Sequence, residues 1–462
     1  MNLLIILQQV LLMASSNTER KKVIIVGAGF SGLSVAYHLD DSKFDVQILE
    51  ARDRLGGRVY PYDLDGTMID LGGQWVHEAS RGNPIRQLME ELKIPFAYGS
   101  SNKKGKKEKR PIFDDGGKEI SVSTYKLASK FYYKALHEYD DRDVDVTTSF
   151  QDLLNRALQS SSNKVVTDEF AQALNYLCHR SECYEGGRLN EVSAYLDEIY
   201  ENLGGPDQVP EGGYNEVIKA VAAKIGDEKI RLGCVVESID YESNTAEGNV
   251  SVNLGGGKLI KGDICVCTVP LGVLQHRKIS FSPQLPEARW SAIDAIGMGL
   301  LDKVALKFDR CFWEYHYFAT TDADPTLVKN FYDCSNDVGA PVLLMFLGGD
   351  AARRIDSPTG MSDEEAVSEA MESLRSIFGD DIPNPVATKV TRWNLDPFAY
   401  GAYSFAKIGS TEEDYDEVAT PLGNLLFAGE HTSKHAHSCV HGAWATGQRE
   451  ASRLHGWLTT TK

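Results

Sequence analysis

A short apolar run, a glycine-rich turn and an amphipathic helix follow one another in KKVIIVGAGFSGLSVAYHL, residues 21–39, and limit the fold more than any other stretch. The run from Val23 to Val26 predicts a buried strand. Gly27, Gly29 and Gly32 then form G-x-G-x-x-G where the helix begins. In this pattern the first glycine allows the turn, the second lets the backbone approach a pyrophosphate, and the third lets helix and strand pack closely. The helix N-terminus would face the phosphates.

The next segment, FDVQILE, reads as a second strand that ends in Glu50. An acidic residue at this place can accept hydrogen bonds from the ribose hydroxyls of an adenine dinucleotide. The context of strand, turn, helix and strand makes the glycine motif far more specific than the bare pattern. The stretch therefore predicts a Rossmann-like dinucleotide-binding unit rather than a tight turn followed by a chance acid.

A second glycine pair comes directly afterwards, in ARDRLGGRVY, residues 51–60. Nicotinamide enzymes do not need such a pair, whereas many flavoproteins have one. Gly57, with its neighbour Gly56, would allow another close pass of backbone along the diphosphate, and the planar guanidinium of Arg58 could neutralise a phosphate. Arg52 is a further cofactor candidate, with a surface position as the alternative.

The size and charge of the chain restrict its function. At 462 residues it exceeds the size that one hydrophobic core usually spans, so we expect two domains. The formal net charge of −18 argues against nucleic-acid binding, which needs basic patches, and favours encounter with a cationic substrate. The oligomeric state cannot be read from these features.

Eight cysteines are too few for a disulfide scaffold in a chain of this length. Cys265 and Cys267 are two residues apart in a strand-like run, which predicts core packing on one shared face. Cys178, His179 and Cys183 lie close together, but no second ligand pair has a fitting spacing. We therefore expect no metal.

The N-terminal stretch MNLLIILQQVLLMASS is an apolar run that ends in small residues, as in a secretory signal. No lysine or arginine precedes the run, and Gln8 and Gln9 interrupt it. It is also too short to span a bilayer, so we expect no stable membrane insertion. We therefore expect residues 1–19 to be a signal-like or untranslated leader, and the localisation stays open between the cytoplasm, which we prefer, and secretion.

Six stretches together resemble the flavin-containing amine oxidase family, which includes polyamine, spermine and monoamine oxidases and the flavin-dependent histone demethylases. Two of them are GAGFSGL and EARDRLGGRVY, described above. The others are DLGGQWVH (70–77), CTVPLGVL (267–274), TRWNLDPFAYGAYSF (391–405) and LLFAGEHTSKHAHSCVHGAWATGQREA (425–451). The similarity extends from residue 21 to the end of the chain and is closest to polyamine and spermine oxidases. Only residues 101–200 match poorly.

The resemblance implies an α/β fold in which a Rossmann-like FAD-binding domain is interleaved with an α+β substrate-binding domain. The FAD-binding domain would be assembled from residues 20–100, 205–290 and 390–462. The substrate domain would take residues 101–204 and 291–389.

The family also implies which residues contact FAD. The loop DLGGQWVH would run beside the flavin ring, the aromatic segment would lie near it, and Glu430 would bind the ribityl or phosphate region. Val236 matches a position whose backbone contacts adenine, with a core valine as the alternative. The residues implied in this way are Gly73, Gln74, Trp75, Val236, Trp393, Glu430, Cys439 and Val440. Monoamine oxidases attach flavin through a cysteine that would align near Ala402, so we expect noncovalent FAD.

The segment LDKVALKFDRCFW, residues 301–313, contains the candidate catalytic residue Lys303. Taken alone, the alternation reads as a half-buried strand with two solvated lysines. In the family, a strand with this pattern of lysine, leucine and aromatic residues carries a lysine that holds a water beside flavin N5. Lys303 occupies that place, and burial would lower its pKa. Lys307 is expected to be a solvated surface residue.

Four residues are candidates for binding substrate. His77 stands where animal polyamine and spermine oxidases have histidine and some plant polyamine oxidases have glutamate, and it is a second catalytic candidate. Glu78 would place a carboxylate near the cavity mouth, or would be an exposed loop acid. Tyr403 fits one aromatic wall of an amine site, while Cys439 stands where several members have the second aromatic residue.

The expected reaction is the two-electron oxidation of a polyamine C–N bond, in spermine, spermidine or an N-acetylated form. Hydride transfer to FAD gives an imine that water hydrolyses to an aldehyde and a shorter amine, and molecular oxygen yields hydrogen peroxide. One alternative is oxidation of a monoamine or an L-amino acid; the latter would need a cation for the carboxylate. Histone demethylation is disfavoured because the chain lacks room for a helical hairpin insertion. Another alternative is an FAD-binding interaction protein without catalysis.

Overall fold

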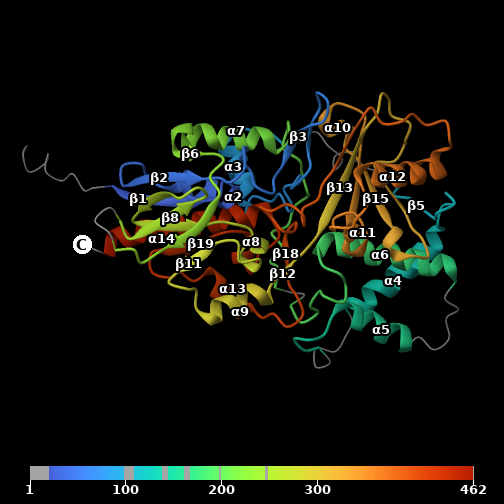
Figure 1. Cartoon of the computed structure of the whole chain (residues 1–462). Helices are drawn as coiled ribbons and strands as arrows, with labels where there is room; N and C mark the ends of the chain where they lie inside the picture. The colour runs from blue at the N-terminus through green and yellow to red at the C-terminus, as the bar shows by residue number, and fades with distance from the viewer. Residues whose placement is uncertain are drawn as a thin grey trace, which may run out of the picture.

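The computed structural model describes residues 20–97, 109–137, 144–160, 167–196, 199–244 and 248–460. The leader expected at residues 1–19 lies outside the described residues. Figure 1 shows a sheet with its helices at one end of the molecule and a second sheet with other helices at the opposite end. The fold is of mixed α/β class, as the sequence predicts.

The first sheet is parallel and has the strand order β19-β10-β1-β2-β6. Its strands are β1 (Lys21–Val26), β2 (Phe44–Leu49), β6 (Ile230–Arg231), β10 (Ile264–Cys267) and β19 (Leu425–Phe427). Val23 and Ile25 pack into the core on one face, whereas Ile24 and Val26 pack into the core on the other. Burial of both faces explains why the strand is an uninterrupted apolar run.

Four helices cover one face of this sheet. They are α2 (Phe30–His38), α3 (Pro84–Leu92), α7 (Tyr214–Ile225) and α14 (Val440–Thr460). The helix that follows the glycine motif, α2, packs closely against α14: a Cβ at Gly447 would meet the Ser31 carbonyl oxygen at 2.3 Å. Ser34 Oγ donates to the Trp444 carbonyl at 2.7 Å. The first and last helices of the described chain are therefore joined beside the glycine turn.

A smaller sheet and three helices cover the opposite face. The sheet has the order β11-β7-β8-β9, with β7 (Val236–Asp240), β8 (Val250–Leu254), β9 (Lys258–Gly262) and β11 (Ser280–Ser282). The helices are α8 (Leu271–Gln275), α9 (Glu287–Ala295) and α13 (Glu412–Ala419). Elsewhere in the described chain, short 3-10 helices lie at Asp227–Lys229, Pro325–Leu327 and Glu430–Thr432. Cys265 and Cys267 are both buried in the core on this side, which confirms their predicted packing role.

The second large sheet has the order β17-β13-β16-β15-β14-β5 and is antiparallel except between β14 and β5. Its strands are β5 (Ile112–Phe113), β13 (Leu301–Lys307), β14 (Tyr317–Thr320), β15 (Lys329–Asp333), β16 (Val342–Gly348) and β17 (Ala387–Val390). Helix α12 (Asp363–Phe378) packs on one face, and the hairpin of β3 (Pro61–Asp63) and β4 (Met68–Asp70) packs on the other.

The strand β13 is buried on both faces, because Val304 and Leu306 contact the α12 side while Ala305 contacts the hairpin side. The interpretation of two solvated lysines is therefore wrong. Lys303 is only 3% exposed. Lys307 is also less exposed than expected: its side chain is 16% exposed and lies 3.7 Å from the Asp65 carboxylate, because the hairpin covers this end of the strand.

The remaining helices belong to the end of the molecule with the mixed sheet (Figure 1): α4 (Val122–His137), α5 (Phe150–Ser160), α6 (Asp168–Glu185), α10 (Ser335–Val338) and α11 (Gly349–Arg353). The short antiparallel pair β12 (Gly297–Met298) and β18 (Ser404–Phe405) lies between the two ends. We propose that the parallel and mixed sheets are the centres of two interleaved domains, divided as the sequence predicts.

Within the ranges given above, no helix is both long and apolar enough to cross a bilayer. In the same part of the chain, no three histidine, cysteine, aspartate or glutamate side chains come together in a way that could hold a metal ion.

The close packing of helix and strand at Gly32 can be tested by adding a methyl group. A Cβ at Gly32 would lie 2.0 Å from the Gly27 carbonyl oxygen, so Gly32→Ala must displace the turn. We expect this variant to be purified with less than a tenth of the wild-type FAD content, measured from the flavin absorbance. Gly456→Ala, in helix α14 with open space around the added carbon, is the matched control. It should keep full FAD and gain up to about 1 kcal/mol of stability. Equal FAD content in both variants would contradict the assigned role of Gly32.

Candidate functional site

A cavity of about 390 Å³ opens where β1, β2, β10 and β19 reach their carboxyl ends. This is the edge at which open α/β sheets bind ligands. Residues from several distant parts of the chain line the cavity. Twelve of them are candidate site residues from the sequence analysis. They are Gly27, Gly29, Glu50, Arg52, Gly57, Arg58, Gly73, Val236, Tyr403, Glu430, Cys439 and Val440.

Backbone without side chains forms one wall of this cavity. Gly27 and Gly57 have positive φ angles of 105° and 61°, which favour glycine. A Cβ at Gly57 would come within 3.1 Å of the Gly29 Cα, so the two glycine loops touch directly. Helix α2 starts at this contact, and its N-cap, Gly29, offers no side chain to its free N–H groups. This cradle fits a diphosphate, because uncapped N–H groups at a helix N-terminus attract anions.

Glu50 is buried at the end of β2 and lines the cavity. One carboxylate oxygen accepts a hydrogen bond from Ala28 N at 2.7 Å and the other from Arg52 N at 2.9 Å. An ionised carboxylate has about four acceptor sites, so these two bonds leave capacity for ribose hydroxyls. Glu50 therefore both fixes the glycine turn and remains a suitable ribose ligand.

The two predicted arginines on the cavity wall are each paired with a carboxylate. Arg52 Nη2 lies 2.9 Å from Asp396 Oδ2, and its guanidinium is 5.4 Å from the centre of the Phe398 ring. Its side chain is only 14% exposed, so the surface alternative is wrong. Arg58 Nη1 donates to Glu430 Oε1 at 2.9 Å and to the Ala402 carbonyl at 3.0 Å.

Glu430 is the centre of a buried polar network. Its Oε2 accepts hydrogen bonds from Ser404 Oγ at 2.6 Å and from Ser438 N at 2.7 Å. Burial alone would raise the pKa of Glu430, but the Arg58 cation and these donors lower it to about 2. The carboxylate is therefore ionised throughout the physiological range and holds three distant segments of the cavity wall together.

Lys303 lies behind the cavity wall rather than on it. Its ammonium donates to the carbonyls of Asp70 at 2.9 Å and Gly72 at 2.8 Å, and to Gln74 Oε1 at 3.1 Å. These three bonds use all the donors of an ammonium group. Burial lowers the pKa of Lys303 below its ordinary 10.5, while the nearby Asp70 carboxylate opposes this change. The lysine thus fixes the loop that carries Gly73 to the cavity, and loss of its proton would free a lone pair there.

Four predicted cofactor residues do not line the cavity. Gly32 acts one layer behind it, through the close packing described above. Gln74 is buried and bonded to Lys303, and Trp75 packs against Tyr332 and Phe346 with ring centres 5.2 and 5.7 Å away. Trp393 is only 5% exposed and belongs to the core beneath α12. Contact of Gln74, Trp75 or Trp393 with FAD remains a prediction.

The predicted substrate residues separate in the structure. Tyr403 and Cys439 line the cavity, and the Tyr403 hydroxyl donates to the Cys183 carbonyl. His77 is 40% exposed outside the lining and pairs with Asp207. Glu78 is not an exposed loop acid: it is 7% exposed, and its Oε2 accepts a hydrogen bond from Leu203 N at 2.7 Å. One internal bond leaves acceptor capacity on the carboxylate, so substrate binding by Glu78 remains a prediction.

Sequence reasoning missed part of the lining. Thr268, Val269 and Pro270 follow β10 directly, and Thr268 Oγ1 donates to the Val26 carbonyl at 2.8 Å. Their position directly after an apolar strand could have identified them as lining residues. Tyr400 also lines the cavity and belongs to the aromatic segment 391–405 that was expected near the flavin, although it was not singled out. Lys278 lines the cavity as well, and nothing in the residues around it marks this position.

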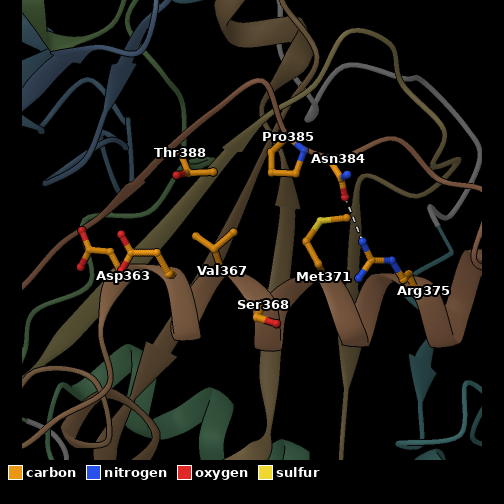
Figure 2. A pocket seen from close by; sticks show the side chains of 9 residues that line it. Asp363, Val367, Ser368, Met371, Arg375, Asn384, Pro385 and Thr388 are labelled. Carbon is orange, nitrogen blue, oxygen red and sulfur yellow. Dashed lines mark hydrogen bonds between the residues drawn. The ribbon is translucent and has the colours of Figure 1, made fainter.

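A second hollow, of about 360 Å³, lies between α12 and the segment that leads into β17 (Figure 2). Arg375 at its edge donates to Asn384 Oδ1 at 2.9 Å. None of its lining residues lines the cavity at the parallel sheet, and none was predicted as a site residue.

A family model described as flavin containing amine oxidoreductase matches residues 30–455. The chain belongs to this family. Polyamine oxidase 2 of Arabidopsis thaliana is 31% identical over 436 residues, which cover 92% of this amine oxidoreductase and 86% of the relative. Lysine-specific histone demethylase 1 homolog 3 of the same plant is 33% identical over 488 residues, covering 94% of this chain and 30% of the relative.

The fold of this amine oxidoreductase also matches a solved structure of wild-type putrescine oxidase bound to putrescine. The TM-score is 0.75 and the identity 22%, with 95% of this chain and 99% of the other covered. The chain spans between 30% and 58% of the length of the histone demethylases that it matches.

The cofactor of this amine oxidoreductase is FAD, held noncovalently. The glycine cradle, the helix N-terminus and Glu50 fit the diphosphate and the adenosine ribose. FAD held here would supply a two-electron acceptor, and the residues around the cavity would supply its position and electrostatic environment.

The depressed pKa of Glu430 predicts a specific dependence of stability on pH. A carboxyl group whose pKa is lower in the folded state stabilises the protein fully above its ordinary pKa of 4.5 and loses this effect as the pH falls toward 2. We expect Glu430→Gln to lower the free energy of unfolding by about 3 kcal/mol at pH 7 and by progressively less below pH 4.5. Urea unfolding of the holoprotein at several pH values measures this difference.

The control for this measurement is Glu91→Gln, which removes an exposed partner of Lys224. It should change the free energy of unfolding by less than about 1 kcal/mol. A Glu430→Gln penalty that stays constant down to pH 2 would show that the carboxylate charge is not the source of the stability.

Proposed function

We propose that this amine oxidoreductase oxidises a C–N bond of a polyamine such as spermine, spermidine or an N-acetylated form. The observation that supports a cationic substrate most directly is the pairing of the cavity-wall arginines with Asp396 and Glu430. An L-amino acid would need a free cation for its carboxylate, and neither arginine offers one. The third cationic residue of the lining, Lys278, has its ammonium 5.3 Å from the centre of the Tyr400 ring. The net charge of −18 also favours encounter with cations.

The relatives support the same choice. The matched region spans 86% of Polyamine oxidase 2, but at most 58% of the histone demethylases that resemble the chain. Because identity to both groups is similar, oxidation of a methylated lysine side chain is the second candidate.

The proposed chemistry places a neutral amine nitrogen beside FAD, because an ammonium has no lone pair to assist the departure of hydride from the neighbouring carbon. FAD held in the cavity would supply the acceptor for this hydride. The substrate becomes an imine, which water hydrolyses to an aldehyde and a shorter amine, and molecular oxygen is the proposed final acceptor, giving hydrogen peroxide. Tyr403 and Cys439 would orient the amine on the cavity wall, while Lys303 would keep the Gly73 loop in place and could accept a proton near it.

The substrate proposal is tested by mixing the oxidised holoprotein anaerobically with spermine, spermidine, N-acetylspermine, butylamine, L-leucine and a dimethyl-lysine peptide. We expect the polyamines to bleach the flavin absorbance at least tenfold faster than the other compounds at equal concentration. The products should be an aldehyde and a shorter amine, identified by mass spectrometry. Faster bleaching by the peptide would favour the second candidate, and no bleaching by any amine would reject catalysis.

Lys303→Met tests the role of the buried lysine. This variant removes three hydrogen bonds from the loop of Asp70, Gly72 and Gln74 but leaves the glycine cradle intact. We expect it to retain FAD and to slow flavin reduction or reoxidation by at least tenfold, which is about 1.4 kcal/mol or more in the barrier. Stopped-flow absorbance follows both half-reactions. Lys307→Met, on the same strand and outside the cavity lining, is the control and should stay within twofold of wild type. Unchanged rates in Lys303→Met would reject its role.

A further inference from the structure

Three cationic side chains line the cavity, and Lys278 differs from the other two in having no anionic partner. Arg52 pairs with Asp396 and Arg58 with Glu430, each at 2.9 Å. Lys278 is exposed, and no carboxylate of the described chain forms an ion pair with it. Its positive charge is therefore available to a ligand.

The strand that follows Lys278 fixes its place along the cavity. β11 runs parallel to β7, with Ser280 opposite Ser238. Two residues back along both strands, this register sets Lys278 beside Val236, and both line the cavity. Ile279, which comes next in the chain, also lines the cavity and packs in the same core as Val236. Lys278 and Val236 thus belong to one part of the wall.

This part of the wall also contains Glu50. Cys234, two residues before Val236, lines the cavity and donates from its backbone N to the Glu50 carbonyl at 2.7 Å. The Glu50 carboxylate fits the adenosine ribose, and Val236 is the residue that the family resemblance implies for adenine. Lys278 therefore lies at the end of the cavity that fits adenosine.

The Lys278 ammonium is held near an aromatic ring without losing its hydrogen-bond donors. It lies 5.3 Å from the centre of the Tyr400 ring, which also lines the cavity. Tyr400 in turn stacks on His276, with ring centres 4.2 Å apart and an angle of 16° between the planes. Contact with an aromatic face limits the motion of the lysine side chain but uses none of its N–H donors. The cation is thus positioned and still able to bind an anion.

The two carboxylates in this part of the wall are engaged elsewhere. Glu237 is exposed, and a Cβ at Gly255 would meet its Oε1 at 3.4 Å, so this carboxylate lies against the turn between β8 and β9. The Glu50 carboxylate is buried and accepts hydrogen bonds from Ala28 N and Arg52 N. Neither acid occupies the Lys278 ammonium.

We propose that Lys278 is a cofactor-binding residue whose ammonium pairs with the adenosine-side phosphate of FAD. The inference goes beyond the proposed function, because it concerns the cofactor and holds whichever amine is oxidised. A lysine ammonium is a compact point charge that suits a phosphate. In a chain of net charge −18, an unpaired cation at the cavity also offsets the repulsion that a diphosphate meets. With Lys278 on the phosphate, no cation of the described lining remains for the carboxylate of an amino acid.

The test compares ligands that contain or lack the adenosine half of FAD. FAD and FMN are titrated into the apoprotein and followed by flavin fluorescence, and ADP is titrated by calorimetry. We expect Lys278→Met to raise the Kd for FAD and for ADP about fivefold, as loss of a good exposed ion pair would, and to leave that for FMN within about twofold. In about 1 M sodium chloride, which screens exposed charges, the difference for FAD should shrink below about twofold. Release of FAD from the diluted holoprotein should be correspondingly faster in the variant.

Two further variants separate a lost charge from a damaged wall. Lys278→Arg keeps the charge and should bind FAD within twofold of the wild type. Lys258→Met removes an exposed lysine of β9 that lies outside the cavity lining, and it should leave all three affinities unchanged. The proposal is overturned if Lys278→Met binds FAD as tightly as the wild type, if FMN weakens as much as FAD, or if the full effect persists at high salt.

Discussion

The buried ion pair of Arg58 and Glu430 is the interaction on which the arrangement of the cavity depends. Its partners are 372 positions apart in the chain, yet their side chains meet at 2.9 Å. The same carboxylate holds Ser404 and Ser438, so one charge fixes the glycine-pair loop, the aromatic segment and the start of α14. Breaking such a pair is costly, because the remaining charge stays buried without a partner. Loss of this contact would therefore destabilise the wall around the FAD site.

The second constraint is the buried Lys303, which connects the mixed sheet to the FAD site. A lysine this deeply buried is tolerated because its three donors all find acceptors on the loop of residues 70–74. The loop continues from the β3–β4 hairpin that covers the same face of the sheet, and it brings Gly73 to the cavity. The loop then runs on to His77 and to the pair with Asp207. One segment thus connects the cavity lining, the buried lysine and the pair of His77 with Asp207.

Sequence patterns predicted the features that depend on residues close together in the chain. The apolar run, the glycine spacing and Glu50 specify the turn from their own neighbourhood. The resemblance implied that Lys303 is desolvated, and its side chain is indeed buried. The errors concern contacts between distant residues. No local pattern shows that Glu78 is bound by Leu203 N, 125 positions later, or that Asp207 meets His77. Trp393 packs in the core beneath α12, and its contact with the flavin stays a prediction. Aromatic residues suit both cores and cofactor walls, so sequence alone does not distinguish these two environments.

The central claim, that the pair of Arg58 and Glu430 builds the FAD cavity, is tested most directly by a double-mutant cycle on the affinity for FAD. The dissociation constant of FAD is measured for the wild type, Arg58→Met, Glu430→Gln and the double variant by fluorescence titration of the apoprotein. The account predicts that each single change weakens binding and that the double change costs less than their sum, with a coupling of about 1–3 kcal/mol. Strictly additive effects, or wild-type affinity in either single variant, would contradict it.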